Sequence, residues 1–456
     1  MTRLSSWLVV LVGATVVMAG GSVWAGGEGI PAKDPHAVTA EYRNGFRLAS
    51  GDGKFALRLS AGFQYRYSYL RYDHDIKGNE NDYSNFYLRR ARLYLDGTAF
   101  DPRFTYLLHV QLEPGSAVNL LDGYVQYEID PMFRILAGRN KIAYGLEFLN
   151  SGFGLNFIDR SIMYGETDIN SGGGTSRWPG GNASFPSAGE NPNTGFSTGG
   201  LSLYRSQGLQ LAGQTAFTSA GAFEYQVGVW NGRDTRGSSN TGSKLLYSAR
   251  VGYYPLGAVG WQVAGDQSYT ESFRFGVVAS YYSQNSLHNK DASGATVPTY
   301  TAEDRGHNVA MLARFKGFSA DVEWGTEAYD LGRRLVGRTR FDRGAWRVSL
   351  GYFVVRGRVE VVARHAEVER LKDPTADAVT NSGLGFVQVW NGTEFVAAIE
   401  ERLSETTAGV NIYFGAHQHK LFFDVSTLTR GFAPYHGYTP GEQKDTRFRS
   451  MIQVKV

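Results

Sequence analysis

Arginines recur at even spacing along several predicted strands. Arg90 and Arg92 stand two residues apart within residues 87–97, and Arg58 and Arg66 share one parity further upstream. Side chains separated by an even number of residues point to the same face of a strand. A guanidinium group presents a planar fork of donors that matches phosphate and carboxylate oxygens, so such a row of arginines would attract small anions.

The segment that holds Arg90 and Arg92 has two faces of opposite character. One carries Tyr87, Ala91, Leu93 and Leu95, and the other carries Arg90, Arg92, Tyr94 and Asp96. The same alternation recurs in many segments, which is too often for one soluble core to cover. A closed barrel in a membrane resolves this, because apolar side chains face lipid while charged ones face a wet lumen. The sequence therefore predicts an all-β, transmembrane, antiparallel up-and-down β-barrel.

The connections between predicted strands alternate in length. Short ones centre on 101–102, 130–131, 219–221, 316–317, 356–357 and 415–417, and long ones on 73–82, 143–200, 231–242, 286–302, 330–340, 371–402 and 431–446. Outer-membrane barrels have short periplasmic turns, long outer loops and an even number of strands. We count about sixteen strands. Two connections break the rule, since 114–118 is short where a long loop is due and 255–269 is long where a turn is due.

The connection 143–200 is longer than an ordinary loop, which indicates function or disorder. Its first part, Tyr144 to Glu166, is rich in apolar residues that a solvated loop would not need. We predict that this part folds into the lumen and constricts it; the alternative is an outer cap that packs on other loops. The second part, Asn170 to Gly200, is rich in Gly, Ser, Asn and Pro, and we expect it to be mobile.

The chain begins with features of export. Residues 1–25 combine Arg3, an apolar stretch and a small residue at Ala25, which predicts a cleaved signal peptide. We interpret 26–50 as a flexible N-terminal leader and 51–456 as the barrel domain. Cys is 0, so no disulfide or Cys metal site is possible. Mean hydropathy is −0.29, and no long apolar run after the signal predicts a helical membrane span.

Charges on the predicted lumen face leave two interpretations open. Basic residues there outnumber acidic ones only modestly, and an arginine-rich lumen favours anions. The alternative is a ladder of salt bridges between neighbouring strands, which shapes the field without selecting a solute. Of the catalytic patterns, Gly195–Gly199 matches G-x-S-x-G but lies in a Gly/Ser-rich loop, and His417 and His419 stand at a short turn without other ligands nearby. We predict no catalytic residues, no cofactor, no metal and no nucleic-acid partner.

Several segments, in order, resemble the phosphate-selective porin O and P family. They are 89–97 (RRARLYLDG), 121–127 (LDGYVQY), 138–147 (GRNKIAYGLE), 157–161 (FIDRS), 229–232 (VWNG) and 408–414 (AGVNIYF). The resemblance implies a sixteen-stranded outer-membrane barrel, usually trimeric, whose best-known members pass phosphate or polyphosphate. It also implies that lumen arginines lead to a lysine at a constriction formed by the third loop.

Arg90, Arg92 and Lys141 match the family motifs, with Arg139 beside them. Ala143 stands where the family tends to have Pro. From the residues and the resemblance together, we predict an outer-membrane porin of the bacterial cell for small hydrophilic solutes, with a preference for anions such as phosphate. The expected ion pathway comprises Arg58, Arg66, Arg90, Arg92, Arg139 and Lys141, and the expected partners are outer-membrane lipid and two further copies in a homotrimer. The rival hypotheses are a barrel enzyme and a non-conducting structural or adhesive barrel.

Overall fold

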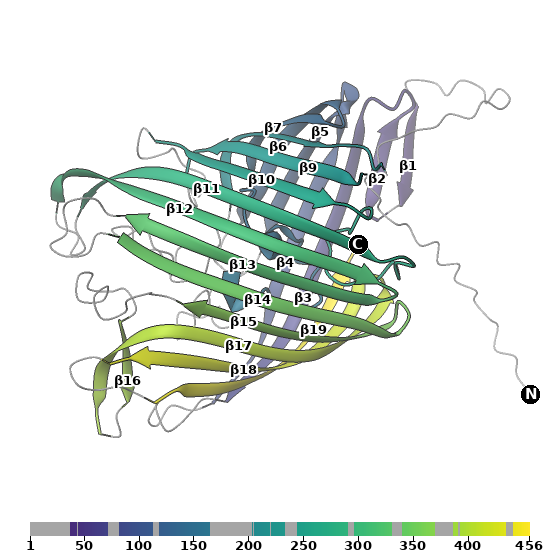
Figure 1. The fold of residues 1–456 in the computed structure, drawn as a ribbon. Helices are drawn as coiled ribbons and strands as arrows, with labels where there is room; N and C mark the ends of the chain where they lie inside the picture. Colours follow the sequence, from purple (N-terminus) through teal and green to yellow (C-terminus); the bar gives the residue numbers. More distant parts are fainter. Residues whose placement is uncertain are drawn as a thin grey trace, which may run out of the picture. The chain divides into compact units, whose positions relative to one another are not determined.

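Sixteen antiparallel strands pair edge to edge and close into a ring (Figure 1). In order around the ring they are β3 (Ala56–Arg71), β4 (Tyr83–Ala99), β5 (Asp101–Gln111), β6 (Asn119–Asp130), β7 (Phe133–Lys141), β8 (Arg205–Gln214), β9 (Ala222–Trp230), β10 (Leu246–Tyr254), β11 (Arg274–Lys290), β12 (Thr296–Phe315), β13 (Phe318–Asp330), β14 (Arg340–Val355), β15 (Val359–Glu369), β17 (Phe395–Gly415), β18 (His419–Ala433) and β19 (Gln443–Lys455). Pairing of β19 with β3 closes the ring. The predicted sixteen-stranded up-and-down barrel is confirmed.

The computed structural model describes residues 37–42, 44–71, 82–112, 118–164, 203, 205–218, 220–232, 244–290, 296–330, 340–369, 386–390, 393–434 and 441–456. The predicted signal peptide 1–25, the predicted mobile segment 170–200 and the G-x-S-x-G match at 195–199 lie outside these residues. Within them, no helix is long and apolar enough to cross a membrane.

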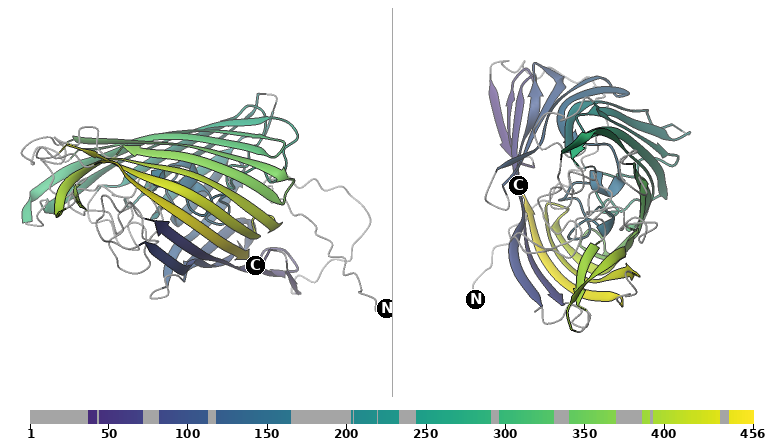
Figure 2. Two further views of the ribbon diagram at one scale, coloured as in Figure 1. Left: turned by 90° about the horizontal axis from the view of Figure 1, so that it is seen from below. Right: turned by 90° about the vertical axis from the view of Figure 1, so that its left-hand side faces the viewer.

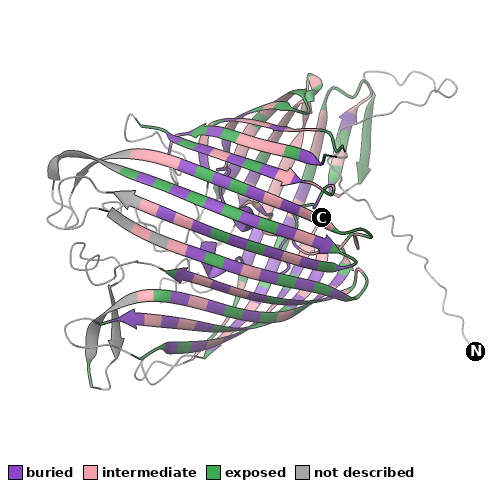
Figure 3. Ribbon diagram, in the orientation of Figure 1, coloured by how far each residue is buried: buried purple, intermediate pink, exposed green. Residues whose placement is uncertain are grey.

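Exposure alternates along the strands as the sequence pattern predicts (Figure 3). On β3, Phe63 and Tyr65 point outward and are about half exposed, whereas Gln64 and Arg66 between them are buried inside the barrel. On β13, Val322 and Trp324 lie outside and Glu323 lies inside in the same way. Since outward positions are apolar and inward ones polar, the outer surface suits lipid and the inner one suits water.

A β-bulge at Arg89 and Arg90 changes the predicted faces of β4. Gln64 pairs with Arg90 and the next residue, Tyr65, pairs with Leu88, so Arg89 is an extra residue. Two residues opposite one neighbour let both arginines point inward. Tyr87, predicted on the apolar outer face, instead lies inside, with the Arg66 guanidinium 4.3 Å from the centre of its ring. The prediction for Tyr87 was wrong because a one-residue insertion reverses the parity beyond it.

The predicted leader 26–50 extends too far along the chain. Residues Val38–Tyr42 (β1) and Phe46–Ser50 (β2) form a hairpin, and β2 pairs with the start of β3. The barrel sheet therefore begins before residue 51. Strands of five residues beside several Gly and Pro give only a weak alternation signal, which explains the error.

The connections place two segments inside the ring. The connection between β7 and β8, which is the third at its end of the barrel, contains α2 (Leu146–Leu149) and the 3₁₀ turn η1 (Ile162–Tyr164), and we call residues 142–164 the inner loop. At the opposite end, residues 255–273 join β10 to β11 and remain long where neighbouring strands are joined by turns such as Lys316–Gly317. A further short strand, β16 (Phe386–Trp390), pairs with the start of β17.

We predict that Val322→Arg lowers the free energy of unfolding by about 2–4 kcal/mol, because it places a charge on the lipid face near the middle of β13. Val354→Arg, on the same face but at the end of β14, should cost at most about 1 kcal/mol. Equilibrium unfolding by denaturant in phosphatidylcholine vesicles measures both. Equal costs at the two positions would contradict the assignment of this face to lipid.

Candidate functional site

The inner loop lies within the ring of strands rather than above it. Seen along the barrel, the blue segment with the short helix α2 sits inside the ring (Figure 2, right). The side chains of Ile142, Tyr144, Phe148, Ile162 and Met163 are buried. The loop therefore occupies the barrel interior, where any solute has to pass it.

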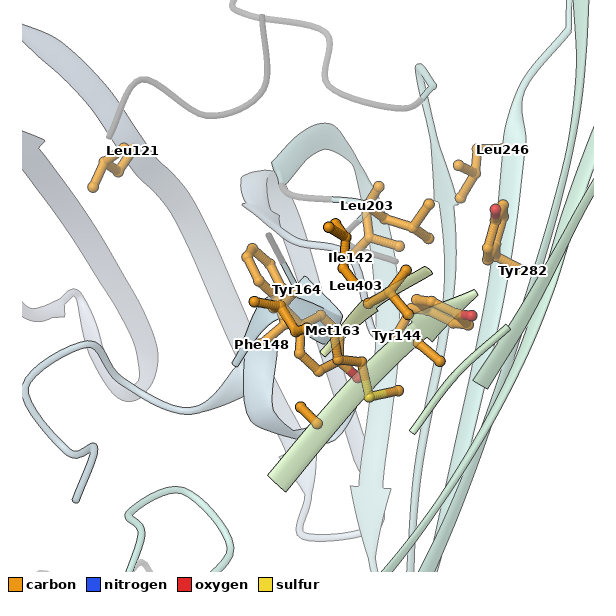
Figure 4. Packing of buried hydrophobic residues seen from close by; sticks show 14 of the residues in the cluster. Leu121, Ile142, Tyr144, Phe148, Met163, Tyr164, Leu203, Leu246, Tyr282 and Leu403 are labelled. Atoms are coloured by element: carbon orange, nitrogen blue, oxygen red, sulfur yellow. The ribbon is translucent and has the colours of Figure 1, made fainter. Parts of the chain in front are cut away.

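Apolar residues on the inner wall receive the loop. Ile142, Tyr144, Phe148, Met163 and Tyr164 form one cluster with wall residues (Figure 4). The wall members are Leu70, Leu121, Trp230, Leu246, Tyr282, Ala345, Ala366, Val368, Leu403 and Leu428. The ring of Tyr144 meets that of Tyr282 edge to face at 4.8 Å. This packing removes apolar surface of both partners from water, which stabilises the docked loop.

Asp159 of the loop is bound by four arginines of the wall. Its carboxylate pairs with Arg66 of β3, with Arg89 Nε at 2.7 Å, with Arg449 Nη1 of β19 at 3.1 Å and with Arg90 Nη2 at 3.5 Å. All five side chains are at most 7% exposed. Because the β-bulge turns Arg89 inward beside Arg90, β4 supplies two of these four partners.

The surroundings of Asp159 fix its charge. Burial alone would raise the pKa of this carboxyl, but Arg66, Arg89, Arg449 and Arg90 outweigh burial and hold the pKa well below its usual value of 3.8. Asp159 is therefore ionised at neutral pH, and its interaction with the four arginines is a charged one.

A second group of carboxylates holds the helical parts of the loop. Glu323 of β13 accepts hydrogen bonds from the backbone N–H of Leu146 at 2.6 Å and of Glu147 at 3.2 Å, at the start of α2. Glu405 of β17 accepts from the N–H of Ile162 at 3.1 Å. These wall carboxylates satisfy N–H groups that a helix start leaves without an internal partner.

Arginines balance these carboxylates in turn. Arg347 lies 2.8 Å from Glu323, and Arg364 lies 2.8 Å from Glu405 and 3.4 Å from Glu147. Arg447 also binds Glu405, at 3.0 Å. Burial and the neighbouring Glu323 carboxylate raise the pKa of the Tyr164 hydroxyl, which therefore stays protonated and donates to Glu323.

The family model for the phosphate-selective porin O and P family matches residues 59–354, more than half of the chain. The chain belongs to this porin family. It is an outer-membrane porin of the bacterial cell, as the sequence predicted. No curated protein matches the chain in sequence.

Solved structures of similar fold come from several bacteria. The anion-selective porin from Comamonas acidovorans has a TM-score of 0.48 and 10% identity, over 87% of this chain and 99% of that one. The trimer form of OmpT from Vibrio cholerae has a TM-score of 0.48 and 11% identity, over 88% of this chain and 99% of that one. The channel DcaP of Acinetobacter baumannii has a TM-score of 0.49 and 11% identity, over 88% of this chain and 97% of that one. At such identities we transfer no residue role from these structures.

The six predicted pathway residues of this porin have different surroundings. Arg66 and Arg90 bind Asp159, as described above. Arg58 pairs with Asp96 at 2.9 Å, and both are partly exposed. Arg92 is half-buried and stands opposite Gly62 and Gln111. That any of them contacts a passing solute stays a prediction.

Lys141 and Arg139 both bind backbone carbonyls. Lys141 Nζ donates to the carbonyls of Phe148, Leu149 and Asn150 at 2.8, 3.1 and 2.8 Å, at the end of α2. A cation there satisfies carbonyls that the helix leaves open. Arg139 is buried, and its Nε donates to the Leu121 carbonyl at 3.1 Å. In this porin, Lys141 thus positions the inner loop.

Sequence reasoning missed Asp159, Glu147 and Glu405, although Asp159 lies in one of the family segments. A usable signal existed, because Asp159 and Arg160 are the charged residues of a stretch, 153–164, that is otherwise uncharged and mostly apolar, and buried charges need partners. His417 lies 2.8 Å from Lys420 Nζ through its Nδ1. Across the residues with described positions, no group of His, Asp and Glu is arranged to hold a metal ion.

We predict that Asp159→Asn loosens the inner loop. Removing one partner of a buried ion pair leaves the arginines uncompensated, which costs about 3–5 kcal/mol in free energy of unfolding. Single-channel recordings should show larger current fluctuations than in the parent protein. Asp101→Asn is the matched control, since Asp101 pairs with Arg103 at an exposed strand end. Identical recordings from both variants would rule out a holding role for Asp159.

We also predict that the inner loop withstands mild acid. The folded pKa of Asp159 lies below its unfolded value, so its contribution is full above about pH 4 and is lost as the pH falls towards the folded pKa. Current fluctuations should therefore be the same at pH 7 and pH 5. Fluctuations that increase between these two values would show that the loop is held by another group.

Proposed function

We propose that this porin conducts small hydrophilic anions in preference to cations, and that the inner loop is its constriction. The supporting observation is the charge balance around the loop. Among the described residues of this network, seven wall arginines meet five carboxylates. The arginines are Arg66, Arg89, Arg90, Arg347, Arg364, Arg447 and Arg449, and the acids are Glu147, Asp159, Glu323, Glu405 and Asp424.

The sequence left two interpretations open, an arginine-rich lumen that favours anions and a ladder of salt bridges, and this network has features of both. Salt bridges do form, as a structural ladder would require, and among the described residues of the network the arginines outnumber the carboxylates, with Arg160 of the loop as a further basic residue. A basic group beside the lumen acts over about 10 Å at moderate salt, which reaches across a narrow passage. The preference therefore arises from the field of the whole network rather than from one bare docking site.

The solute class follows from the chemistry of the guanidinium group. Its planar fork favours oxyanions, so phosphate, polyphosphate and small carboxylates are the anions that we expect to interact most strongly. Arg92 and Arg58 are members of the predicted pathway that combine an inward position with partial exposure. We infer that a solute in the lumen can contact both guanidinium groups.

We further infer that the protein acts as a channel rather than as an enzyme and that it forms a homotrimer in outer-membrane lipid. Membership of a porin family supports the channel role. The outward side chains Phe63, Tyr65, Val322 and Trp324 provide an apolar wall, which lipid or a neighbouring subunit can cover.

The test of anion preference is the reversal potential across a KCl gradient in a planar bilayer, followed by addition of phosphate. The parent protein should be chloride-selective, and phosphate should reduce the current. Two charges about 10 Å from a solute contribute up to about 0.8 kcal/mol in water, so Arg90→Gln with Arg92→Gln should lower selectivity roughly two- to fourfold.

Arg103→Gln is the matched control, because it removes a charge at an exposed strand end and should leave the reversal potential unchanged. Weakly selective current that ignores phosphate would leave a general porin without anion preference. Complete absence of current would favour a structural or adhesive barrel, and hydrolytic turnover in detergent would favour an enzyme.

A further inference from the structure

The connection 255–273 crosses the barrel interior at the end where the other connections are short. It leaves β10 after Tyr254 and enters β11 at Arg274, and we call it the strap. Because short connections mark the periplasmic end of an outer-membrane barrel, the strap belongs to the periplasmic half of the channel. Its length is the departure from alternation that the sequence already showed.

The strap is tied to the wall near its origin. Trp261 donates through Nε1 to Glu224 of β9 at 3.1 Å, and the guanidinium of Arg250 lies 4.2 Å from the centre of the indole. Val259 packs with Tyr254 and with Leu146 of the inner loop. These contacts combine a hydrogen bond, a cation–π contact and apolar packing, so this part of the strap is fixed.

The tip of the strap reaches the far wall. A Cβ on Gly265 would lie 2.7 Å from Glu360 Oε1 of β15, so the backbone there touches that side chain. The imidazole of His417, in the turn between β17 and β18, lies close to the backbone of Ala264. In the sixteen-strand ring, β17 and β18 lie six and seven places from β10. The strap therefore spans the interior from one side to nearly the opposite one.

The strap also touches the inner loop from the periplasmic side. Ala264 N–H donates to the Gly154 carbonyl at 2.8 Å, and Ser151 N–H donates to the Gln262 carbonyl at 3.4 Å. A Cβ on Gly154 would lie 2.7 Å from Val263 Cγ1, so a larger residue at this position would force the Val263 side chain to shift.

The return of the strap to β11 is fixed as well. The Asp266 carboxylate accepts from the N–H of Gly317 at 2.8 Å and of Thr270 at 2.9 Å. Lys316 N–H donates to the Thr270 carbonyl at 2.7 Å. Backbone groups of both segments are thereby paired inside the barrel, which a freely moving loop would leave to water.

We propose that the strap is a second constriction, which limits the size of the solutes that leave the inner loop towards the periplasm. Residues 255–265 carry no charged side chain, and Leu256, Ala258, Gly260, Gln262 and Val263 are exposed. Residues 255–265 of the strap therefore filter by size, whereas the arginines around the inner loop act on charge. This inference rests on the channel function, but not on anion preference.

The experiment compares single-channel conductance with the uptake of neutral sugars of increasing size into proteoliposomes. Replacing 256–271 by Asn-Gly, a sequence suited to a tight hairpin turn, should raise the conductance roughly twofold or more and admit larger sugars, because pore width limits both. Gln262→Trp, which adds bulk at an exposed position of the tip, should lower both. The reversal potential should change little in Gln262→Trp, whereas the replacement also removes Asp266 and Glu271 and should shift it towards anion selectivity.

Trp261→Ala removes the anchor on Glu224 and should raise the conductance and the current fluctuations, even if the deletion fails to fold. Trp324→Ala, which alters an outward-facing tryptophan, is the matched control and should behave like the parent protein. If Gln262→Trp and Trp261→Ala both keep the conductance and the size limit of the parent protein, the strap is not a constriction, although the channel function stands. No current from the parent protein would overturn both.

Discussion

The interaction of Asp159 with four arginines is the constraint on which the interior of this barrel depends. A carboxylate in an apolar interior is costly unless opposite charges lie close to it. Arg66, Arg89, Arg90 and Arg449 meet this need from β3, β4 and β19, the strands at the closure of the ring. A single side chain of the inner loop thus bridges the first and last strands of the barrel, which links closure of the barrel to the place of the loop.

Similar ion pairs hold the loop on the other side of the interior. Glu323 and Glu405 hold backbone N–H groups of the loop, and Arg347, Arg364 and Arg447 neutralise these acids. The loop is thereby held on both sides of the lumen by charged groups of the wall. The arginines that hold these acids are also the residues to which we attribute the proposed anion preference, so the structural role and the proposed selectivity involve one set of side chains.

The barrel could be predicted from the sequence because the alternation of apolar and polar residues within each strand shows which residues lie on which face. Alternation of the kind seen at Phe63, Gln64, Tyr65 and Arg66 is local, and so is the length of a connection. Tyr87 shows where this fails, since one extra residue at Arg89 reverses the faces and no periodicity marks an insertion of one. The hairpin of β1 and β2 was missed for a related reason, because five residues carry too few alternations.

The inner site depends on contacts that no local pattern contains. Asp159 lies 290 residues from Arg449, and the pairing follows only once the ring has closed. Part of the surface against which the loop packs nevertheless has a signal in the sequence. Leu70, Leu403 and Leu428 are apolar at inward positions of their strands, and they pack with the loop. The unusual length of 255–269 likewise indicated that this connection is not an ordinary turn, but it did not predict which residues the strap contacts.

Hydrogen exchange of the inner loop tests the central claim most directly. The N–H groups of Leu146, Glu147 and Ile162 donate to wall carboxylates. We predict that, in lipid nanodiscs, mass spectrometry finds peptides from 142–164 as protected as those of β13 and β17. If they exchange as fast as the turn at 356–358, the loop is not held inside the barrel, and the account of the constriction is contradicted.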